Sequence, residues 1–180
     1  MAWDSLKMDN RFRLTGIVPP YYINEYLLKS HGYTVPGKRP GAVQYIVISG
    51  APVPESHVSN DTAKEHVRCI DTNGMLPHYV VGNPGTWQIL DLEDSWQCSD
   101  GSVNDKSICI APILCSGFGG GYMYTYVAIH DIAIVSAYLL KKYKLTTKNI
   151  KVTKECSPFI REHWKDFITQ TRQWMKKGAK

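Results

Sequence analysis

The sequence predicts an α/β fold in which helices flank a central mixed β-sheet. Short apolar runs rich in β-branched and aromatic residues, bounded by Gly or Pro, indicate strands. Longer stretches with apolar residues at helical spacing indicate helices. Because the two types alternate and one strand pair is joined by a tight turn, the sheet should be mixed, with helices on both faces. The length of 180 residues, 43% of them hydrophobic and 21% charged, favours one globular domain.

The stretch from Gln44 to Gly50 is expected to be the central strand. It is a short apolar run with Pro40-Gly41 before it and Gly50-Ala51-Pro52 after it. In sheets covered by helices, binding and catalytic residues gather at strand ends. Ser49, at the end of this strand, is therefore the first candidate for a functional position.

The other elements follow in chain order. We expect a short helical turn at 24–29, then a helix over 59–70 that the capping box at 62–65 begins. A hairpin should follow, since Gly82-Asn83-Pro84-Gly85 separates two apolar runs. The remaining predictions are strands at 107–114 and 150–153, a glycine-rich linker at 117–121, a buried helix at 123–143 and an amphipathic helix at 160–175. Residues 1–36 are interpreted as a leader packed on a single domain, 37–180.

Composition narrows the choice of compartment and partner. There is no N-terminal apolar signal region and no long apolar span, which predicts no membrane contact and a cytoplasmic location. Five cysteines without framework spacing fit reduced thiols in a cytosol. The net charge of +5 is interpreted as ordinary surface charge, because no motif for reading DNA or RNA is present.

Several local motifs, taken in order, resemble the zinc-dependent N-acetylmuramoyl-L-alanine amidases. This family includes phage endolysins and shares its fold with the peptidoglycan recognition proteins. The resemblance extends from about Gly37 to Phe167 and rests on the combined order and spacing of the matches. The matching segments are Lys38-Arg39-Pro40-Gly41, His78-Tyr79-Val80-Val81, Trp96-Gln97-Cys98-Ser99-Asp100-Gly101, Asn104 to Ala111, Leu139 to Tyr143, and Lys154-Glu155-Cys156.

The resemblance implies a zinc site with two histidines and one cysteine or aspartate. Three ligands with a fourth position open for water suit hydrolysis, because the metal acidifies the water and polarises the amide. This chain has Ser49 and Thr153 where the resemblance expects the two histidines, and keeps only Cys156. Hydroxyls are poor zinc ligands at neutral pH. We therefore expect no zinc, no other cofactor and no catalytic residue.

Other positions of the pattern differ as well. Pro77 precedes the His-Tyr-Val-Val match, where the family often has a polar catalytic group. Gln97 occupies the position where the family has a histidine after the tryptophan, and Ala111 occupies the position of the family's strand glutamate. Lys154 remains at a position that can stabilise an oxyanion. The main alternative to a chain without zinc is a metal site built from other residues. Its candidate ligands are His31, His57, His78, Cys98 and Cys156.

A cleft without metal can still bind a ligand. The matched positions would line it with hydroxyls, an amide, a cation and an aromatic wall, which suits a small polar or anionic ligand. Three hypotheses follow: a non-catalytic amidase-fold protein that binds a peptidoglycan fragment or sequesters a host signalling molecule, an active endolysin with an atypical zinc set, and a phage structural or host-protein-interaction module. The expected cleft residues are Ser49, His78, Trp96, Gln97, Thr153, Lys154 and Cys156.

Overall fold

The computed structural model describes residues 10–17, 20–49, 76–82, 85–96, 101–112, 121–154, 156 and 158–177. The helix predicted over 59–70 lies outside these residues, as do His57, Gln97 and Cys98. Of the predicted glycine-rich linker, only Gly121 is described, and it begins a helix.

Seven strands form one mixed sheet in the order β1-β2-β5-β4-β6-β3-β7. Neighbours β4, β6, β3 and β7 are parallel, whereas β1 with β2 and β4 with β5 are antiparallel pairs. The predicted mixed sheet and the predicted hairpin are thus confirmed. The strands are β1 (Asn10–Arg13), β2 (Tyr22–Glu25), β3 (Tyr45–Ile48), β4 (Tyr79–Gly82), β5 (Gly85–Gln88), β6 (Ser107–Pro112) and β7 (Ile150–Val152).

Strand β3 is the predicted central strand, and it is buried between β6 and β7. Val47 faces Cys109 of β6 on one side and Lys151 of β7 on the other. Ile46, Val47 and Ile48 are each at most 1% exposed. Such complete burial explains why the run is apolar at every position instead of alternating.

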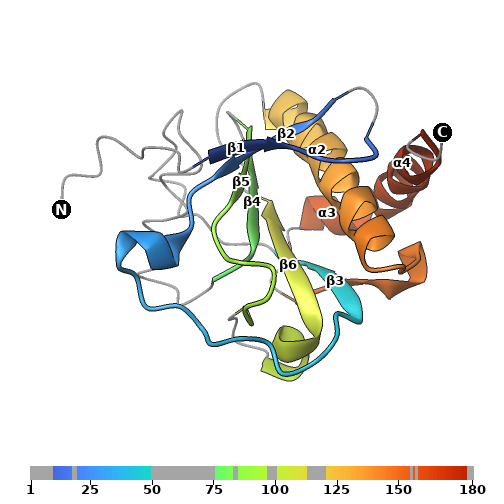
Figure 1. The fold of residues 1–180 in the computed structure, drawn as a ribbon. Coiled ribbons are helices and arrows are strands. Elements are labelled where there is room, and N and C mark those ends of the chain that lie inside the picture. The colour runs from blue at the N-terminus through green and yellow to red at the C-terminus, as the bar shows by residue number, and fades with distance from the viewer. Residues whose placement is uncertain are drawn as a thin grey trace.

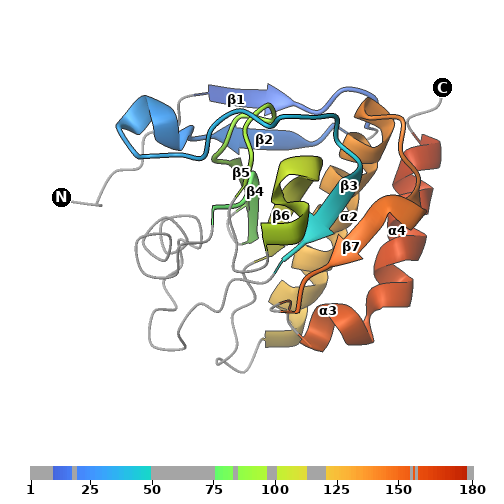
Figure 2. The ribbon, with the colours of Figure 1, turned by 90° about the horizontal axis from the view of Figure 1, so that it is seen from below.

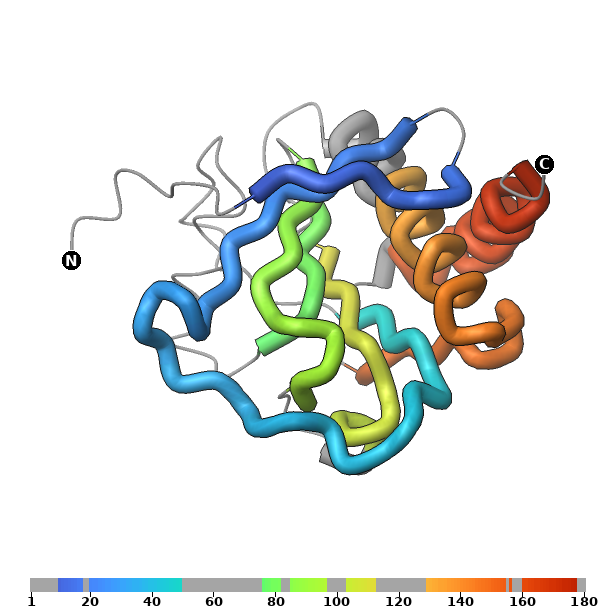
Figure 3. Tube along the Cα trace, in the orientation of Figure 1, coloured from blue at the N-terminus to red at the C-terminus, as the bar shows by residue number. Residues whose placement is uncertain are grey.

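The two faces of the sheet carry two separate apolar clusters. Ile46 and Ile48 point into the larger cluster, which includes the inner face of the long helix and Phe167. Val47 points the other way, into a smaller cluster with Trp96. This second face is covered in part by the connection between β2 and β3, which passes along the outside of the molecule (Figure 3). Because side chains alternate along a strand, successive residues of β3 point to opposite faces of the sheet.

The described α-helices all lie on one side of the sheet (Figure 1). They are α2 (Gly121–Lys142), α3 (Pro158–Glu162) and α4 (Trp164–Lys177). The terminal helix predicted at 160–175 is present but interrupted at His163. Helix α4 buries Phe167, Thr171 and Trp174, and it packs along α2, as the view from below also shows (Figure 2).

The N-terminal part corrects one prediction. Residues 24–29 were expected to form a helical turn, but Asn24 and Glu25 belong to β2, where they pair with Trp87 and Gln88 of β5. The helical turn starts only at Leu28, as the 3-10 helix η1 (Leu28–His31). Strand β2 has only four residues, of which only Ile23 is buried, and this is too little to separate a strand from a helical turn by periodicity. Strands β1 and β2 thereby extend the sheet beyond the predicted core.

Glycine and short 3-10 helices set the remaining turns. Gly32, with φ of 82°, ends η1 in the left-handed region that favours glycine. The other two 3-10 helices of the described residues are η3 (Gly101–Lys106), which leads into β6, and η4 (Thr147–Asn149), which leads into β7. Among the helices of the described residues, none is long and apolar enough to cross a membrane.

Candidate functional site

Ser49 and Thr153 lie side by side where β3 and β7 end. Ile48 is in register with Val152, so the next residue of each strand occupies the same level of the sheet. The Ser49 backbone N–H donates to the Ile110 carbonyl at 3.0 Å, and the Thr153 N–H donates to the Ile48 carbonyl at 3.1 Å. Both positions are therefore fixed by the sheet ladder. The register of two adjacent parallel strands therefore brings these two predicted cleft residues side by side.

The two hydroxyls are hydrogen-bonded to each other. Ser49 Oγ and Thr153 Oγ1 are 3.0 Å apart, and either oxygen can be the donor. Ser49 is fully buried and Thr153 is 9% exposed. By alternation Ser49 shares the face of Val47, away from α2. A buried hydroxyl needs a partner, and here each residue supplies it for the other.

Cys156 and Lys154 follow Thr153 in a tight turn. The Cys156 backbone N–H donates to the Thr153 carbonyl at 3.2 Å, and Cys156 is 3% exposed. Lys154 is exposed. Arg161 of α3 also donates to the Thr153 carbonyl, so a second cation lies near this turn. The structure thus gathers Ser49, Thr153, Lys154 and Cys156 at one end of the sheet.

His78 does not join that group. It is fully buried, and both ring nitrogens are bonded to the backbone: Nδ1 accepts from the Cys109 N–H at 3.1 Å, and Nε2 lies 3.0 Å from the Asp94 carbonyl. Accepting at Nδ1 requires the neutral tautomer that donates from Nε2. Burial lowers the pKa of His78 to about 3. His78 is therefore a neutral structural link between strands and not part of a cleft wall.

Trp96 lies at the opposite end of β6. Its indole Nε1 donates to Ser107 Oγ at 2.8 Å, and the ring is 1% exposed. Ser107 pairs with Tyr45, the first residue of β3, whereas Ser49 follows the last. The structure therefore separates Trp96 from Ser49 along the length of the strand. Sequence matching placed both in one cleft because it shows that segments are shared but not which end of the sheet they reach.

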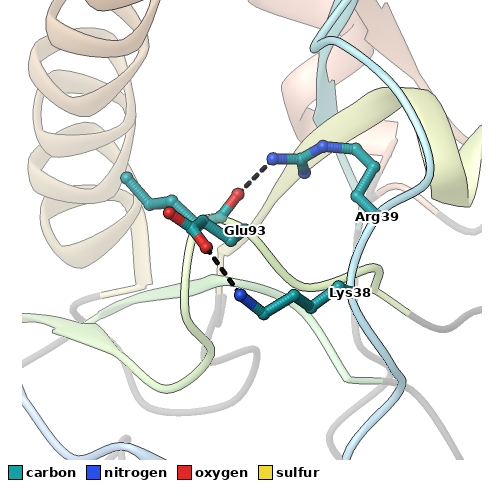
Figure 4. A network of polar contacts seen from close by, with 4 residues as sticks. Lys38, Arg39 and Glu93 are labelled. Carbon is teal, nitrogen blue, oxygen red and sulfur yellow. Dashed lines mark hydrogen bonds and ion pairs between the residues drawn. The ribbon is translucent and has the colours of Figure 1, made fainter.

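Arg39 is a polar centre whose role the sequence did not reveal. Its guanidinium donates to the backbone carbonyls of Leu92, Asp94 and Ser107, and its own N–H donates to the Glu93 carbonyl at 2.7 Å. Lys38 Nζ contacts Glu93 Oε2 at 3.2 Å, on the surface (Figure 4). The planar fork of arginine suits such multiple bonding. Arg39 thus joins the entry of β3 to the loop after β5 and to the start of β6.

Metal-ligating groups are sparse in the described part of the chain. Within those residues, no three His, Cys, Asp or Glu side chains gather closely enough to hold a metal ion. Of the candidates for a rebuilt site, His31 stacks on Tyr26 with ring centroids 3.8 Å apart, and His78 is bonded as described above. His57 and Cys98 lie outside the described residues.

A mixed sheet covered by a long helix, with polar residues at the ends of adjacent parallel strands, places the chain among the α/β proteins. The family model of N-acetylmuramoyl-L-alanine amidase matches residues 39–175. The chain belongs to this family. The match begins at Arg39, so strands β1 and β2 precede the shared core. A search of curated proteins finds no match.

Solved structures agree with this assignment of the fold. A mutant endolysin from Bacillus subtilis is 20% identical, with a TM-score of 0.61, and the likeness covers 83% of this chain and 99% of that one. The PlyG catalytic domain is also 20% identical, with a TM-score of 0.62 over 84% of this chain and 93% of that one. The Staphylococcus aureus hydrolase AmiA, solved in complex with its ligand, is 13% identical, with a TM-score of 0.64 over 86% and 85%. The predicted fold and family are confirmed.

Proposed function

We propose that this chain is an amidase-fold protein that binds a small polar ligand at the ends of β3 and β7 and does not hydrolyse it with zinc. The observation that carries the proposal is the hydrogen bond between Ser49 Oγ and Thr153 Oγ1 at 3.0 Å. These are the positions where the resemblance expects two zinc-binding imidazoles. Each hydroxyl instead satisfies the other.

The residues at this position do not fit a zinc ion. Zinc is held in proteins by thiolate, imidazole and carboxylate groups, and of the described residues gathered at these strand ends only Cys156 offers one. Ser49 and Thr153 carry neutral hydroxyls. To face a divalent cation, these hydroxyls would have to break their mutual hydrogen bond, and they would bring no negative charge to offset that of the cation. No step of a metal-assisted hydrolysis is therefore derived for this chain.

The same geometry supports binding of a polar or anionic group. Thr153 keeps 9% of its surface exposed, whereas Ser49 is fully buried. A ligand would therefore meet the Thr153 hydroxyl first, with Ser49 holding that hydroxyl in place. Lys154 is exposed at the next position, and Arg161 donates to the Thr153 carbonyl. Two cations near an oriented hydroxyl favour a carboxylate or phosphate on the ligand.

The ligand classes we propose are a peptidoglycan fragment or a host signalling molecule that the protein sequesters inside the cell. Peptidoglycan fragments follow from membership of the amidase family. The alternative within the same family is an active amidase that uses ligands outside the described residues, such as His57 and Cys98. A third possibility, a structural or host-protein-interaction module, requires neither ligand nor hydrolysis.

A paired experiment separates these functions. The purified protein is incubated with peptidoglycan to measure amide cleavage, and its melting temperature is measured with and without a purified muropeptide and a set of nucleotides. We expect no cleavage and a melting shift with one ligand class, reduced in Thr153→Val but retained in the surface control Thr169→Val. Cleavage of peptidoglycan would support the active amidase. Absence of both cleavage and any shift would support the interaction module.

A further inference from the structure

A cavity lies away from the Ser49–Thr153 pair. Its volume is about 930 Å³, and its walls come from β1, β2, the loop after β5 and the end of α2. The residues that matter for its chemistry are Phe12, Glu25, Asp94, Tyr138, Lys142 and Tyr143. The volume is in the range of about 300–1,000 Å³ that small-molecule sites occupy. Every wall residue belongs to the described part of the chain.

The cavity is at the other end and on the other face of the sheet from Ser49. Tyr79 contributes to its wall and belongs to the cluster on the α2 face. Ser49 shares the opposite face with Val47. Helix α2 follows β6 and runs back along the sheet, so its last residues, near Lys142, lie at the starting ends of the parallel strands (Figure 1). A ligand in this cavity would therefore not touch the amidase-like strand ends.

One acidic group in the wall, Asp94, feels the positive charges of Lys29 and Lys38 but has no direct donor among the described residues. Asp94 is only 4% exposed, yet in the described part of the chain its carboxylate makes no hydrogen bond and no ion pair. Lys38, the nearby lysine, pairs with Glu93 instead. Burial, followed by the charge of Asp91, raises the pKa of the Asp94 carboxyl. A charge that acts from a distance gives no hydrogen bond, so an ammonium group of a ligand in the cavity would bring donors directly to this carboxyl.

The opposite charge is available across the same cavity. Lys142 Nζ lies 5.8 Å from the Tyr138 ring centroid and 6.0 Å from that of Tyr143, and within the described residues it has no carboxylate partner. Its charge is therefore available to a carboxylate, while the two tyrosines and Phe12 offer apolar surface. Four carboxylate residues and four cationic residues line the cavity in all. This balance disfavours a polyanion such as a nucleic acid.

We propose that this cavity binds a small zwitterionic ligand of the short-peptide class, with its ammonium group at Asp94, its carboxylate at Lys142 and an apolar side chain against Phe12 and Tyr138. The two charged anchors fix the direction of the ligand, and the aromatic wall selects an apolar side chain. Part of this site lies outside the family match, because its wall includes strand β1, which precedes the matched region 39–175.

The test uses glycyl-phenylalanine as the probe, with its N-acetylated, C-amidated form as a neutral compound of similar shape. We expect calorimetry to detect binding of the zwitterion, and the blocked form to bind at least about tenfold more weakly because both charge-assisted contacts are lost. Asp94→Asn should weaken binding of the zwitterion by about tenfold, and Asp166→Asn, an exposed acid on α4, should leave it unchanged.

Two further variants make the outcome decisive. Lys142→Gln changes an exposed side chain, so it tests the carboxylate contact even where Asp94→Asn does not fold. Thr153→Val should not affect glycyl-phenylalanine binding, which separates failure here from failure of the proposed function. Equal affinity for the zwitterionic and blocked peptides, or unchanged affinity in both Asp94→Asn and Lys142→Gln, would overturn the proposal. So would the lack of any binding at about 10 mM peptide, where even a weak site is occupied.

Discussion

The two ends of β3 use polar side chains in opposite ways. At the starting end, the Arg39 guanidinium and the Trp96 indole are bonded to groups of the sheet and its loops. At the finishing end, Ser49 and Thr153 are bonded to each other. Arg39 and Trp96 match the amidase resemblance, and both hold segments of the sheet and its loops together. The finishing end departs from that pattern at the positions that would carry the chemistry.

This difference indicates that the fold and the hydrolytic site have separate requirements. His78, Arg39 and Trp96 satisfy buried backbone or hydroxyl groups, and removing any of them would leave those groups without partners. Ser49 and Thr153 bond to each other through their hydroxyls and are held in the sheet by ladder bonds that any residue can make. The chain can therefore keep the amidase fold with a different pair at the strand ends. Variants at four places in the structure test this comparison.

Arg39→Ala should have the largest effect on stability. Its guanidinium donates to three backbone carbonyls, from Leu92, Asp94 and Ser107, and all three would lose a charged donor. We expect a loss of about 3–5 kcal/mol in the free energy of unfolding, measured by urea denaturation. Arg39→Lys should recover only part of this loss, because an ammonium group cannot reproduce the planar fork. A loss as small as that of a surface arginine such as Arg172 would contradict the scaffold role.

His78→Asn should come next, and it should change the dependence of stability on pH. The asparagine oxygen can still accept from the Cys109 N–H, but the bond to the Asp94 carbonyl is lost, so we expect a cost of about 1–3 kcal/mol. Native His78 has a pKa of about 3, against an ordinary value of 6.5. Between about pH 3 and pH 6.5, this histidine is therefore protonated in the unfolded protein and neutral in the native protein.

The sign follows from this proton balance. Stability of the wild-type protein should be unaffected by His78 above about pH 7 and should fall as the pH drops below 6.5, by at most about 1.4 kcal/mol per pH unit. The His78→Asn variant should lack this component. Urea titrations at several values between pH 5 and pH 7.5 measure both slopes. Equal slopes in the two proteins would mean that native His78 protonates normally.

The Ser49–Thr153 pair should show measurable coupling. In a double-mutant cycle with Ser49→Ala, Thr153→Val and both together, we expect a coupling free energy of about 1 kcal/mol. Either single variant leaves one hydroxyl buried without its partner, whereas the double variant removes both. Additive effects in thermal or chemical denaturation would show that the hydroxyls are not bonded to each other in solution.

Lys38→Ala should have the smallest effect. Lys38 neighbours Arg39 in the chain, but its ion pair with Glu93 is on the surface, with the two side chains 76% and 80% exposed. Such pairs contribute between zero and about 1 kcal/mol. We expect a change below about 0.5 kcal/mol that disappears in high salt. A loss comparable to that of Arg39→Ala would show that the surface pair, and not the buried fork, holds the loop.

Much of the fold could be predicted from the sequence because its signals are local. The apolar run at Tyr45–Ile48, the Gly-Pro turn between β4 and β5, and the apolar helix ending at Lys142 each carry their pattern within a few residues. Strand β2 was missed because a four-residue strand with mixed polarity has no clear period. The break at His163 between α3 and α4 does not interrupt the helical spacing of apolar residues, so periodicity could not show it.

The candidate site was predicted only in part, for a different reason. Ser49, Thr153 and Cys156 could be placed together because each follows, or lies just beyond, the end of one of two parallel strands. The surroundings of His78 and Trp96 depend on Asp94 and Ser107, whose partners are distant in the chain. A motif match gives no information on such contacts. The cavity beside Asp94 and Lys142 was equally invisible, because β1 and α2 meet there only after folding.

The most direct test of the central claim is the zinc content of the purified protein. The chain is expressed and purified with zinc in the buffers, desalted, and analysed by inductively coupled plasma mass spectrometry, with an active endolysin amidase treated in parallel. We predict a zinc content far below one ion per chain for this protein and close to one ion per chain for the control. One tightly bound zinc ion per chain, together with cleavage of peptidoglycan, would contradict it.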